Sequence, residues 1–197
     1  CESTFKNLDG RSCYAWKMTA ISRLNGTSSL HLKPRNKEDL VLVRHRLQDR
    51  SMGVLTASAC GDALGAGYEF QPDPLPSDHS IEMKGGNGFA AGEWTDDSSQ
   101  LVAIGQAAAK GLDLRSIEGR EEVARNYQSW FDSADCHDVG VHTQEVFGTA
   151  SRQRGFHAWA LGEIAREKEE REPNSSGGNG AIMRTAPVAL AFIKDRL

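Results

Sequence analysis

The amino-acid sequence predicts an all-α fold. Apolar residues recur at helical spacing in several segments, and no segment alternates apolar and polar residues as a half-buried strand would. Of the 197 residues, 39% are hydrophobic and 25% are charged, which is typical of a globular protein rather than of a disordered or fibrous chain. The length indicates one domain, with room for an appendage.

The first predicted helix begins at Glu38 and continues through Ala63. Gly53 lies inside this segment and argues against one unbroken helix. Cys60 stands in an apolar run, which predicts a small residue of the core. Residues 1–37 are polar and contain turn signals, so we expect no fold of their own there.

Five more segments have helical periodicity, and loops separate them. They are residues 98–110, 117–131, 144–152 and 156–171, and a last apolar helix from Ala181 or Ile182 towards Ile193. Residues 71–93 are rich in proline and glycine and predict a long surface loop, a kind of segment that is often functional. Residues 173–180 form a second loop of proline, asparagine, serine and glycine.

Charge and cysteine usage exclude several classes of protein. The formal net charge is −4, so bulk attraction to nucleic acid is not expected. Residues 1–50 carry ten Lys and Arg against five Asp and Glu, whereas residues 51–197 carry thirteen against twenty-two, which indicates two regions of different character. No apolar run is long enough to cross a bilayer, and no pair of the four cysteines has CxxC spacing. We expect a cytoplasmic protein with free thiols.

Residues 61–70, GDALGAGYEF, combine small residues with two carboxylates. Glycine and alanine let backbones approach closely. Asp62 and Glu69 lie in a largely apolar context, where burial would raise the pKa of a carboxyl group. The alternative is a tight seam between helices that carries a surface acid.

Residues 92–101, GEWTDDSSQL, lead into a predicted helix. A helix N-cap explains one residue of Thr95, Asp96 and Asp97, but not all three together. Adjacent carboxylates repel each other, and a hydroxyl with two carboxylates is a donor set that suits Mg²⁺, Mn²⁺ or Ca²⁺. On these residues alone, helix capping and metal binding both stay open.

Two further segments have simpler interpretations. In residues 130–140, WFDSADCHDVG, we interpret Trp130 and Phe131 as core aromatics and Asp138 as a turn residue. Residues 175–184, SSGGNGAIMR, are a glycine-rich loop entering a helix, which presents backbone N–H groups to an anion such as a phosphate. A lone glycine-rich loop is a weak signal.

The order and spacing of these four segments together resemble the ADP-ribosylglycohydrolase family. The matching stretches are 61–70, 92–101, 130–140 and 177–190, and the resemblance covers residues 49–197. It implies an all-α bundle with a cleft for two Mg²⁺ ions. It also implies hydrolysis of the glycosidic bond between ADP-ribose and an acceptor, in an ADP-ribosylated protein or a small ADP-ribose conjugate. Residues 1–48 lie outside it as a basic, poorly defined N-terminal segment.

The resemblance assigns roles to particular residues. Thr95, Asp96 and Asp97 would be the metal ligands, with Glu69, Asp96 and Asp97 as the catalytic residues. The residues that contact ADP-ribose would be Ser176, Gly177, Gly178 and Asn179.

One feature of the family pattern is missing. The family carries a second acidic cluster, Asp-x-Asp-Thr, and this sequence contains none. Thr95, Asp96 and Asp97 supply three side-chain oxygens, whereas Mg²⁺ prefers six ligands. Because of this we expect a chain that is truncated at its C-terminus. The first residue is Cys1 rather than Met, which indicates a fragment, a processed product or an incomplete gene model. Three functions stay open: a hydrolase seen in part, a truncated or degenerate relative that binds ADP-ribose without catalysis, and a purely structural helical protein.

Overall fold

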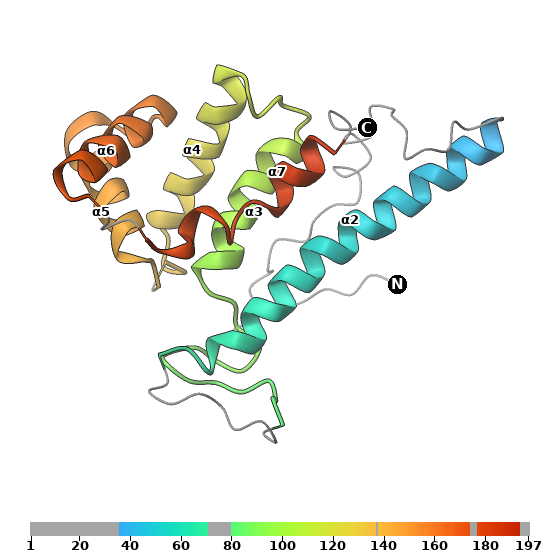
Figure 1. The fold of residues 1–197 in the computed structure, drawn as a ribbon, viewed down its shortest axis with the longest axis horizontal. Coiled ribbons are helices and arrows are strands. Elements are labelled where there is room, and N and C mark those ends of the chain that lie inside the picture. Colours follow the sequence, from blue (N-terminus) through green and yellow to red (C-terminus); the bar gives the residue numbers. More distant parts are fainter. Residues whose placement is uncertain (1–35, 71–79, 137, 174–176, 194–197) are drawn as a thin grey trace.

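The computed structural model describes residues 36–70, 80–136, 138–173 and 177–193, and helices dominate these ranges (Figure 1). In chain order they are α2 (Lys37–Ala66), α3 (Asp96–Ala109), α4 (Ile117–Phe131), α5 (Val141–Thr149), η2 (Ala150–Arg154), α6 (Ala158–Arg171), η3 (Asn179–Ala181) and α7 (Ala186–Ala191). Within these ranges, β pairing is limited to an isolated bridge between Gly86 and Phe89. The all-α prediction is therefore confirmed.

The longest helix, α2, is continuous over 30 residues. Asn36 caps its start, because the Asn36 side chain accepts a hydrogen bond of 2.7 Å from the backbone N–H of Asp39. The expectation of a break at Gly53 is wrong: a glycine costs a helix about 1 kcal/mol relative to alanine, which does not by itself end it. The helix also runs through the domain boundary predicted between residues 48 and 49, which stays a prediction.

Only the C-terminal part of α2 is well covered by the rest of the described structure, against α3 and α7 (Figure 1). Ala63 and Ala66 are the buried hydrophobic residues there. Cys60, one turn earlier, is exposed, so the prediction that it belongs to the core is wrong. An apolar run shows that a helix can be buried, but not which of its faces finds a partner.

The core lies among α3, α4, α5 and α6, and Phe147 of α5 is at the centre of its aromatic cluster. The Phe147 ring centroid is 5.4 Å from that of Tyr127, 5.5 Å from that of Phe131 and 5.0 Å from that of Phe156. Tilted and edge-on ring pairs at these distances stabilise a core beyond the area they bury. Trp130 packs against the same cluster, which confirms Trp130 and Phe131 as core aromatics.

Helix boundaries differ from the predictions mainly at two places. The helix predicted over 144–152 begins at Val141 and passes into the π-helix η2. The last helix begins at Ala186 rather than near 181, because Pro187 lacks a backbone N–H and is tolerated only in the first turn of a helix. The expectation for residues 1–37 falls mostly outside the described residues.

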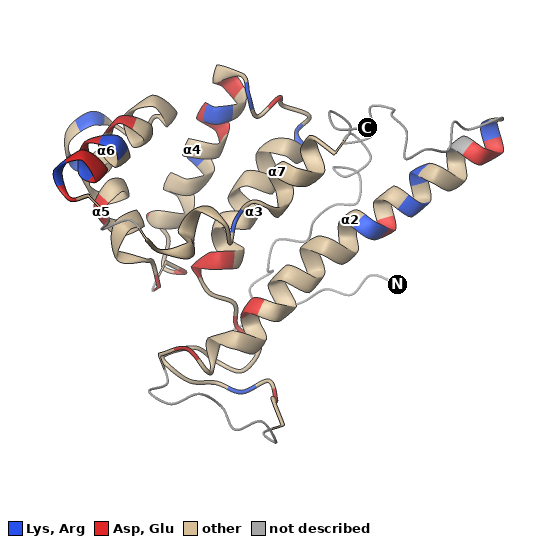
Figure 2. Cartoon of the chain, viewed as in Figure 1, with Lys and Arg blue, Asp and Glu red and all other residues tan. Residues whose placement is uncertain are grey.

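None of the helices in the described ranges combines the length and apolarity that a bilayer crossing requires. Charge is unevenly placed along α2 (Figure 2). Its N-terminal half carries residues of both signs, namely Lys37, Glu38, Asp39, Arg44, Arg46, Asp49 and Arg50, whereas Asp62 is the charged residue of the half that meets α3.

Candidate functional site

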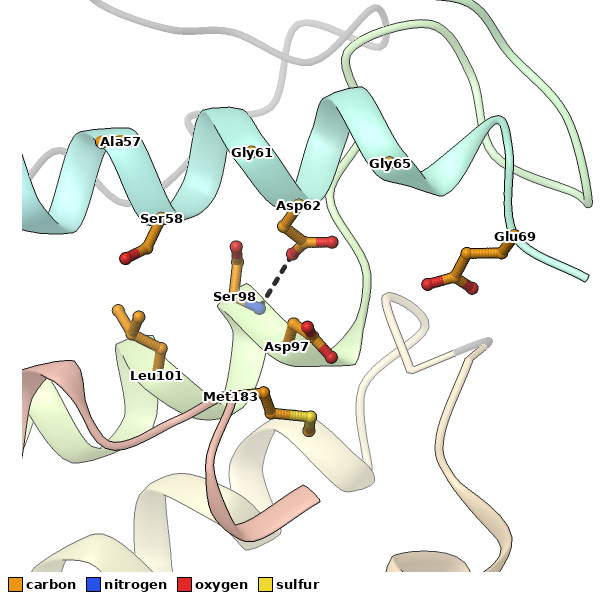
Figure 3. Close-up of a pocket in the computed structure, with 10 residues that line it drawn as sticks. All are labelled: Ala57, Ser58, Gly61, Asp62, Gly65, Glu69, Asp97, Ser98, Leu101 and Met183. Atoms are coloured by element: carbon orange, nitrogen blue, oxygen red, sulfur yellow. Dashed lines mark hydrogen bonds between the residues drawn. The ribbon is translucent and has the colours of Figure 1, made fainter. Parts of the chain in front are cut away.

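The candidate site begins where α2 meets the start of α3 (Figure 3). Asp62 of α2 accepts a hydrogen bond of 2.8 Å from the Thr95 hydroxyl and one of 3.1 Å from the Thr95 backbone N–H. It also accepts one of 2.9 Å from the backbone N–H of Ser98. The first N–H groups of a helix lack partners within the helix, and a negative charge is favourable there. Asp62 therefore fastens the start of α3 to α2.

Asp62→Ala is expected to lower the free energy of unfolding by about 3 kcal/mol, because it leaves part-buried N–H donors of Thr95 and Ser98 without an acceptor. Asp62→Asn should cost less, since its side-chain oxygen still accepts. Urea unfolding of both variants and the wild type measures the difference. Asp49→Asn, at an exposed position of the same helix, is the control and should stay within about 0.5 kcal/mol of the wild type. An Asp62→Ala variant as stable as the wild type would contradict this role.

Thr95 is the N-cap residue of α3, which confirms the capping interpretation for this one residue. Its Oγ1 accepts a hydrogen bond of 3.2 Å from the backbone N–H of Asp97, and it donates its own proton to Asp62. Thr95 is only 3% exposed. A hydroxyl oxygen has two lone pairs, so one remains for a further partner. Capping and metal binding by Thr95 are therefore compatible.

Asp96 is buried beside the N-cap residue of α3, and one of its carboxylate oxygens accepts two hydrogen bonds. Oδ2 accepts a hydrogen bond of 2.9 Å from the Gln100 side-chain amide and one of 3.2 Å from the backbone N–H of Gly140. Gly140 comes immediately before α5, so this contact joins the start of α3 to the start of α5.

Five carboxylates interact electrostatically here, and we name them the acidic cluster: Asp62, Glu69, Asp96, Asp97 and Asp138. Burial is the main cause that raises the pKa of Glu69, Asp96 and Asp97, and repulsion from other members of the cluster raises each further. The pKa of Asp96 reaches about 6, although the hydrogen bond from Gly140 opposes the rise. A proton or a bound cation relieves such repulsion.

A pocket of about 360 Å³ opens beside the acidic cluster (Figure 3). Its walls come from α2 and the turn that follows it, from the start of α3 and from the turn before α7. They consist of Ala57, Ser58, Gly61, Asp62, Gly65, Glu69, Asp97, Ser98, Leu101 and Met183. Figure 3 shows the carboxyl groups of Asp62, Glu69 and Asp97 turned towards one another. Glu69 and Asp97 thus face one pocket, whereas Thr95 and Asp96 are not among the residues that line it. That these four residues form one functional site stays a prediction.

The predicted substrate loop is not brought into this pocket. Gly177, Gly178 and Asn179 are exposed, and none of them lines the pocket. Met183, four residues after Asn179, does line it. Ser176 lies outside the described residues.

Sequence reasoning missed two residues of the site. Asp138, interpreted as a turn residue, belongs to the acidic cluster and raises the pKa of its neighbours. Gln100 holds Asp96 from within α3. A carboxylate two residues before a glycine that starts a helix, inside a segment that matches the family, was a usable signal for Asp138. For Gln100 the available signal was its i,i+4 spacing from Asp96, at which Gln and Asp side chains meet on one helix.

The donor chemistry fits a hard divalent cation. Carboxylates with raised pKa, the remaining lone pair of Thr95 and a buried Ser98 hydroxyl without a partner among the described residues are all oxygen donors. In the part of the chain that the structure describes, however, no three Asp, Glu, His or Cys side chains are placed to hold an ion.

Comparison with known proteins gives this geometry a context. A model of the ADP-ribosylglycohydrolase family matches residues 43–197. The chain belongs to the ADP-ribosylglycohydrolase family. The match includes α2 from its second turn onward and every described residue of the candidate site.

Three curated relatives are identical to the chain at about a third of the aligned positions. It is 32% identical over 146 residues to ADP-ribosylarginine hydrolase Tri1 of Pseudomonas putida (strain GB-1), covering 72% of this chain and 36% of that protein. The Serratia proteamaculans (strain 568) protein of the same name is 32% identical over 149 residues, with the same two coverages.

A third relative, the ADP-ribosyl-[dinitrogen reductase] glycohydrolase of Rhodospirillum rubrum, is 31% identical over 156 residues, covering 75% of this chain and 46% of that protein. The chain therefore spans between about a third and a half of the length of the curated relatives it matches. No solved structure matches it.

Proposed function

We propose that this protein contributes to the Mg²⁺-dependent hydrolysis of the glycosidic bond between ADP-ribose and an acceptor. The supporting observation is that Glu69 and Asp97 converge on one pocket at the start of α3, within a chain of the ADP-ribosylglycohydrolase family. Relatives named for arginine and for dinitrogen reductase favour an ADP-ribosylated protein as the substrate, with a small ADP-ribose conjugate as the alternative.

The charge of the pocket suits this reaction. Cleavage of a glycosidic bond passes through a transition state with positive charge on the sugar ring, which nearby carboxylates stabilise. Glu69 is half-buried, and its raised pKa makes its carboxylate a better acceptor for the proton of an attacking water. In this proposal Glu69 is the base, while Asp96 and Asp97 place negative charge beside the ribose.

Thr95, Asp96 and Asp97 are the residues that we propose to hold Mg²⁺. The ion, when bound, would orient the ribose hydroxyls and a water molecule. The protein's own part is to hold the three oxygen donors still, and Asp62 does this by fastening Thr95 to α2. As the residues that contact ADP-ribose we propose Ser176, Gly177, Gly178 and Asn179, by the family resemblance.

Binding of ADP-ribose by the 197-residue chain is the deciding experiment. Calorimetric titration with ADP-ribose is expected to show binding that strengthens with Mg²⁺ and weakens with a chelator. Because the sequence has no Asp-x-Asp-Thr cluster, we expect little turnover by this chain alone. Release of ADP-ribose from ADP-ribosyl-arginine and ADP-ribosyl-serine peptides measures that turnover and the acceptor preference. No binding at millimolar ADP-ribose with Mg²⁺ would contradict the proposal.

The second candidate is a relative that binds ADP-ribose without hydrolysing it. It is favoured by the missing Asp-x-Asp-Thr motif and by the lack of a complete ligand set among the described residues. Mg²⁺-dependent binding without any release of ADP-ribose from either peptide would support this candidate. A cytoplasmic location, and the absence of membrane and nucleic-acid partners, remain predictions from the sequence.

A further inference from the structure

The side chain of Gln100 joins two parts of the molecule that are far apart in the sequence. It is fully buried within α3. Its Nε2 donates to Asp96 Oδ2 at 2.9 Å, and its Oε1 accepts a hydrogen bond from the guanidinium of Arg184. A carboxylate accepts and a guanidinium only donates, so a single orientation of the amide satisfies both partners. Both ends of this buried amide are therefore specified by charged neighbours.

On the Asp96 side, this contact selects one carboxylate oxygen. Gly140 also donates to Oδ2, so two donors from different segments converge on that atom. Oδ1 accepts no hydrogen bond from any residue that the structure describes. The carboxylate is therefore held by one oxygen, and the other is left for a partner.

On the other side, Arg184 follows the glycine-rich loop. Its guanidinium carbon lies 5.7 Å from the ring centroid of Tyr127, which is buried in the aromatic core, and such a contact holds a cation in place. Gly180 of the loop lies next to it, since a Cβ built at Gly180 would come within 3.8 Å of Arg184 Nη2. Arg184 and this end of the loop are therefore neighbours in space as well as in the sequence.

We propose that Gln100 is a positioning residue for Asp96, and that Arg184 acts through Gln100 to tie the orientation of the Asp96 carboxylate to the glycine-rich loop. The inference rests on the proposed function, since it takes Asp96 to be a ligand of Mg²⁺. Buried polar networks of this kind hold a single arrangement because an unpaired member is costly. Groups that hydrogen-bond to a metal ligand typically contribute about 10 to 100-fold to metal affinity.

Two variants of the 197-residue chain test this role. Gln100→Met keeps the length of the side chain and removes both hydrogen bonds, whereas Gln100→Asn keeps an amide that is too short to reach both partners. Calorimetry with Mg²⁺ is expected to show an affinity about 10 to 100-fold lower in each variant. ADP-ribose affinity in the presence of chelator should change by less than about threefold, because Asp96 is not proposed to bind ADP-ribose without the metal. Gln144→Met, at an exposed position of α5, is the matched control and should leave both affinities unchanged.

The split between the two affinities separates positioning from mere structural support. A purely structural role for Gln100 would lower the melting temperature and weaken both ligands together, and that result would overturn the inference. Unchanged Mg²⁺ affinity in a folded Gln100→Met or Gln100→Asn variant would overturn it as well. If the wild type binds neither Mg²⁺ nor ADP-ribose, the proposed function fails and this inference fails with it. If the wild type binds both ligands and the Gln100 variants bind them equally well, the proposed function stands and this inference alone is lost.

The proposed role of Arg184 is tested by measuring how binding of one ligand changes the affinity for the other. If Gln100 ties Asp96 to the loop, ADP-ribose should raise the affinity for Mg²⁺ in the wild type, and Mg²⁺ should raise the affinity for ADP-ribose by the same factor. Gln100→Met should reduce that factor towards one. An equal factor in the wild type and in Gln100→Met would show that the loop and Asp96 are not coupled through this side chain.

Discussion

Asp97→Asn is expected to weaken Mg²⁺ binding by at least about 100-fold, which is the upper end of what outer-shell partners of a metal contribute, because a proposed ligand itself is lost. Asp97 lines the pocket, and its carboxylate accepts no hydrogen bond from the residues that the structure describes. Both of its oxygens are therefore available to an ion. Calorimetric titration with Mg²⁺ gives the affinity, and Asp49→Asn serves as the control with the same chemical change on an exposed face of α2.

Asp97→Asn should weaken Mg²⁺ binding and at the same time make the folded protein more stable. Burial and repulsion from Asp62 and Asp138 raise the pKa of Asp97, so its charge opposes folding at neutral pH. Removing that charge is expected to increase the free energy of unfolding in the presence of a chelator. Stabilisation with loss of binding is typical of a residue retained for function. An Asp97→Asn variant that binds Mg²⁺ as the wild type does would remove Asp97 from the proposed site.

Much of the fold could be predicted because its helices carry local signals. The segment 117–131 has helical periodicity, Ser116 caps its start, and the observed α4 has the predicted bounds. The π-helix at Ala150–Arg154 could not be predicted, because a change from α to π geometry depends on how the helix end packs rather than on composition. The exposure of Cys60 depends likewise on which face of α2 meets α3 and α7.

The candidate site, like the fold, has parts that could be predicted from the sequence and parts that could not. Thr95, Asp96 and Asp97 could be proposed from their adjacency alone, since three such residues exceed what one helix cap needs. Gln100 is only four residues from Asp96, but two other contacts of this network could not be predicted. Gly140 is 44 residues from Asp96 in the sequence, and Arg184 is 84 residues from Gln100. Hydrogen bonds between distant segments leave no periodicity or spacing to read. They appear only once α3 is packed against its neighbours.

In the absence of divalent ions, the chain is expected to be more stable near pH 5 than near pH 7.5. Asp96 titrates at about 6 in the folded protein, whereas an aspartate in an unfolded chain titrates near 4. As the pH falls through 6, the folded state takes up a proton that the unfolded state does not yet bind, so the free energy of unfolding rises. The full shift corresponds to at most about 3 kcal/mol, since one pKa unit is worth about 1.4 kcal/mol, and about half of it is gained between pH 7.5 and pH 5.

Urea unfolding in chelator at pH 7.5, 6 and 5 measures this rise. The window avoids the salt-bridged carboxylates, since the pKa values of Glu122 and Glu172 lie below the usual 4.5 and both groups stay ionised down to pH 5. Asp96→Asn should remove most of the rise and should be more stable than the wild type at pH 7.5. Saturating Mg²⁺ should raise the free energy of unfolding at pH 7.5 and so reduce its dependence on pH. The reason is that a cation relieves at pH 7.5 the repulsion that a proton relieves at pH 5. If the stability of the wild type instead falls steadily from pH 7.5 to pH 5, in parallel with that of Asp96→Asn, the pKa of Asp96 is not raised in the folded protein.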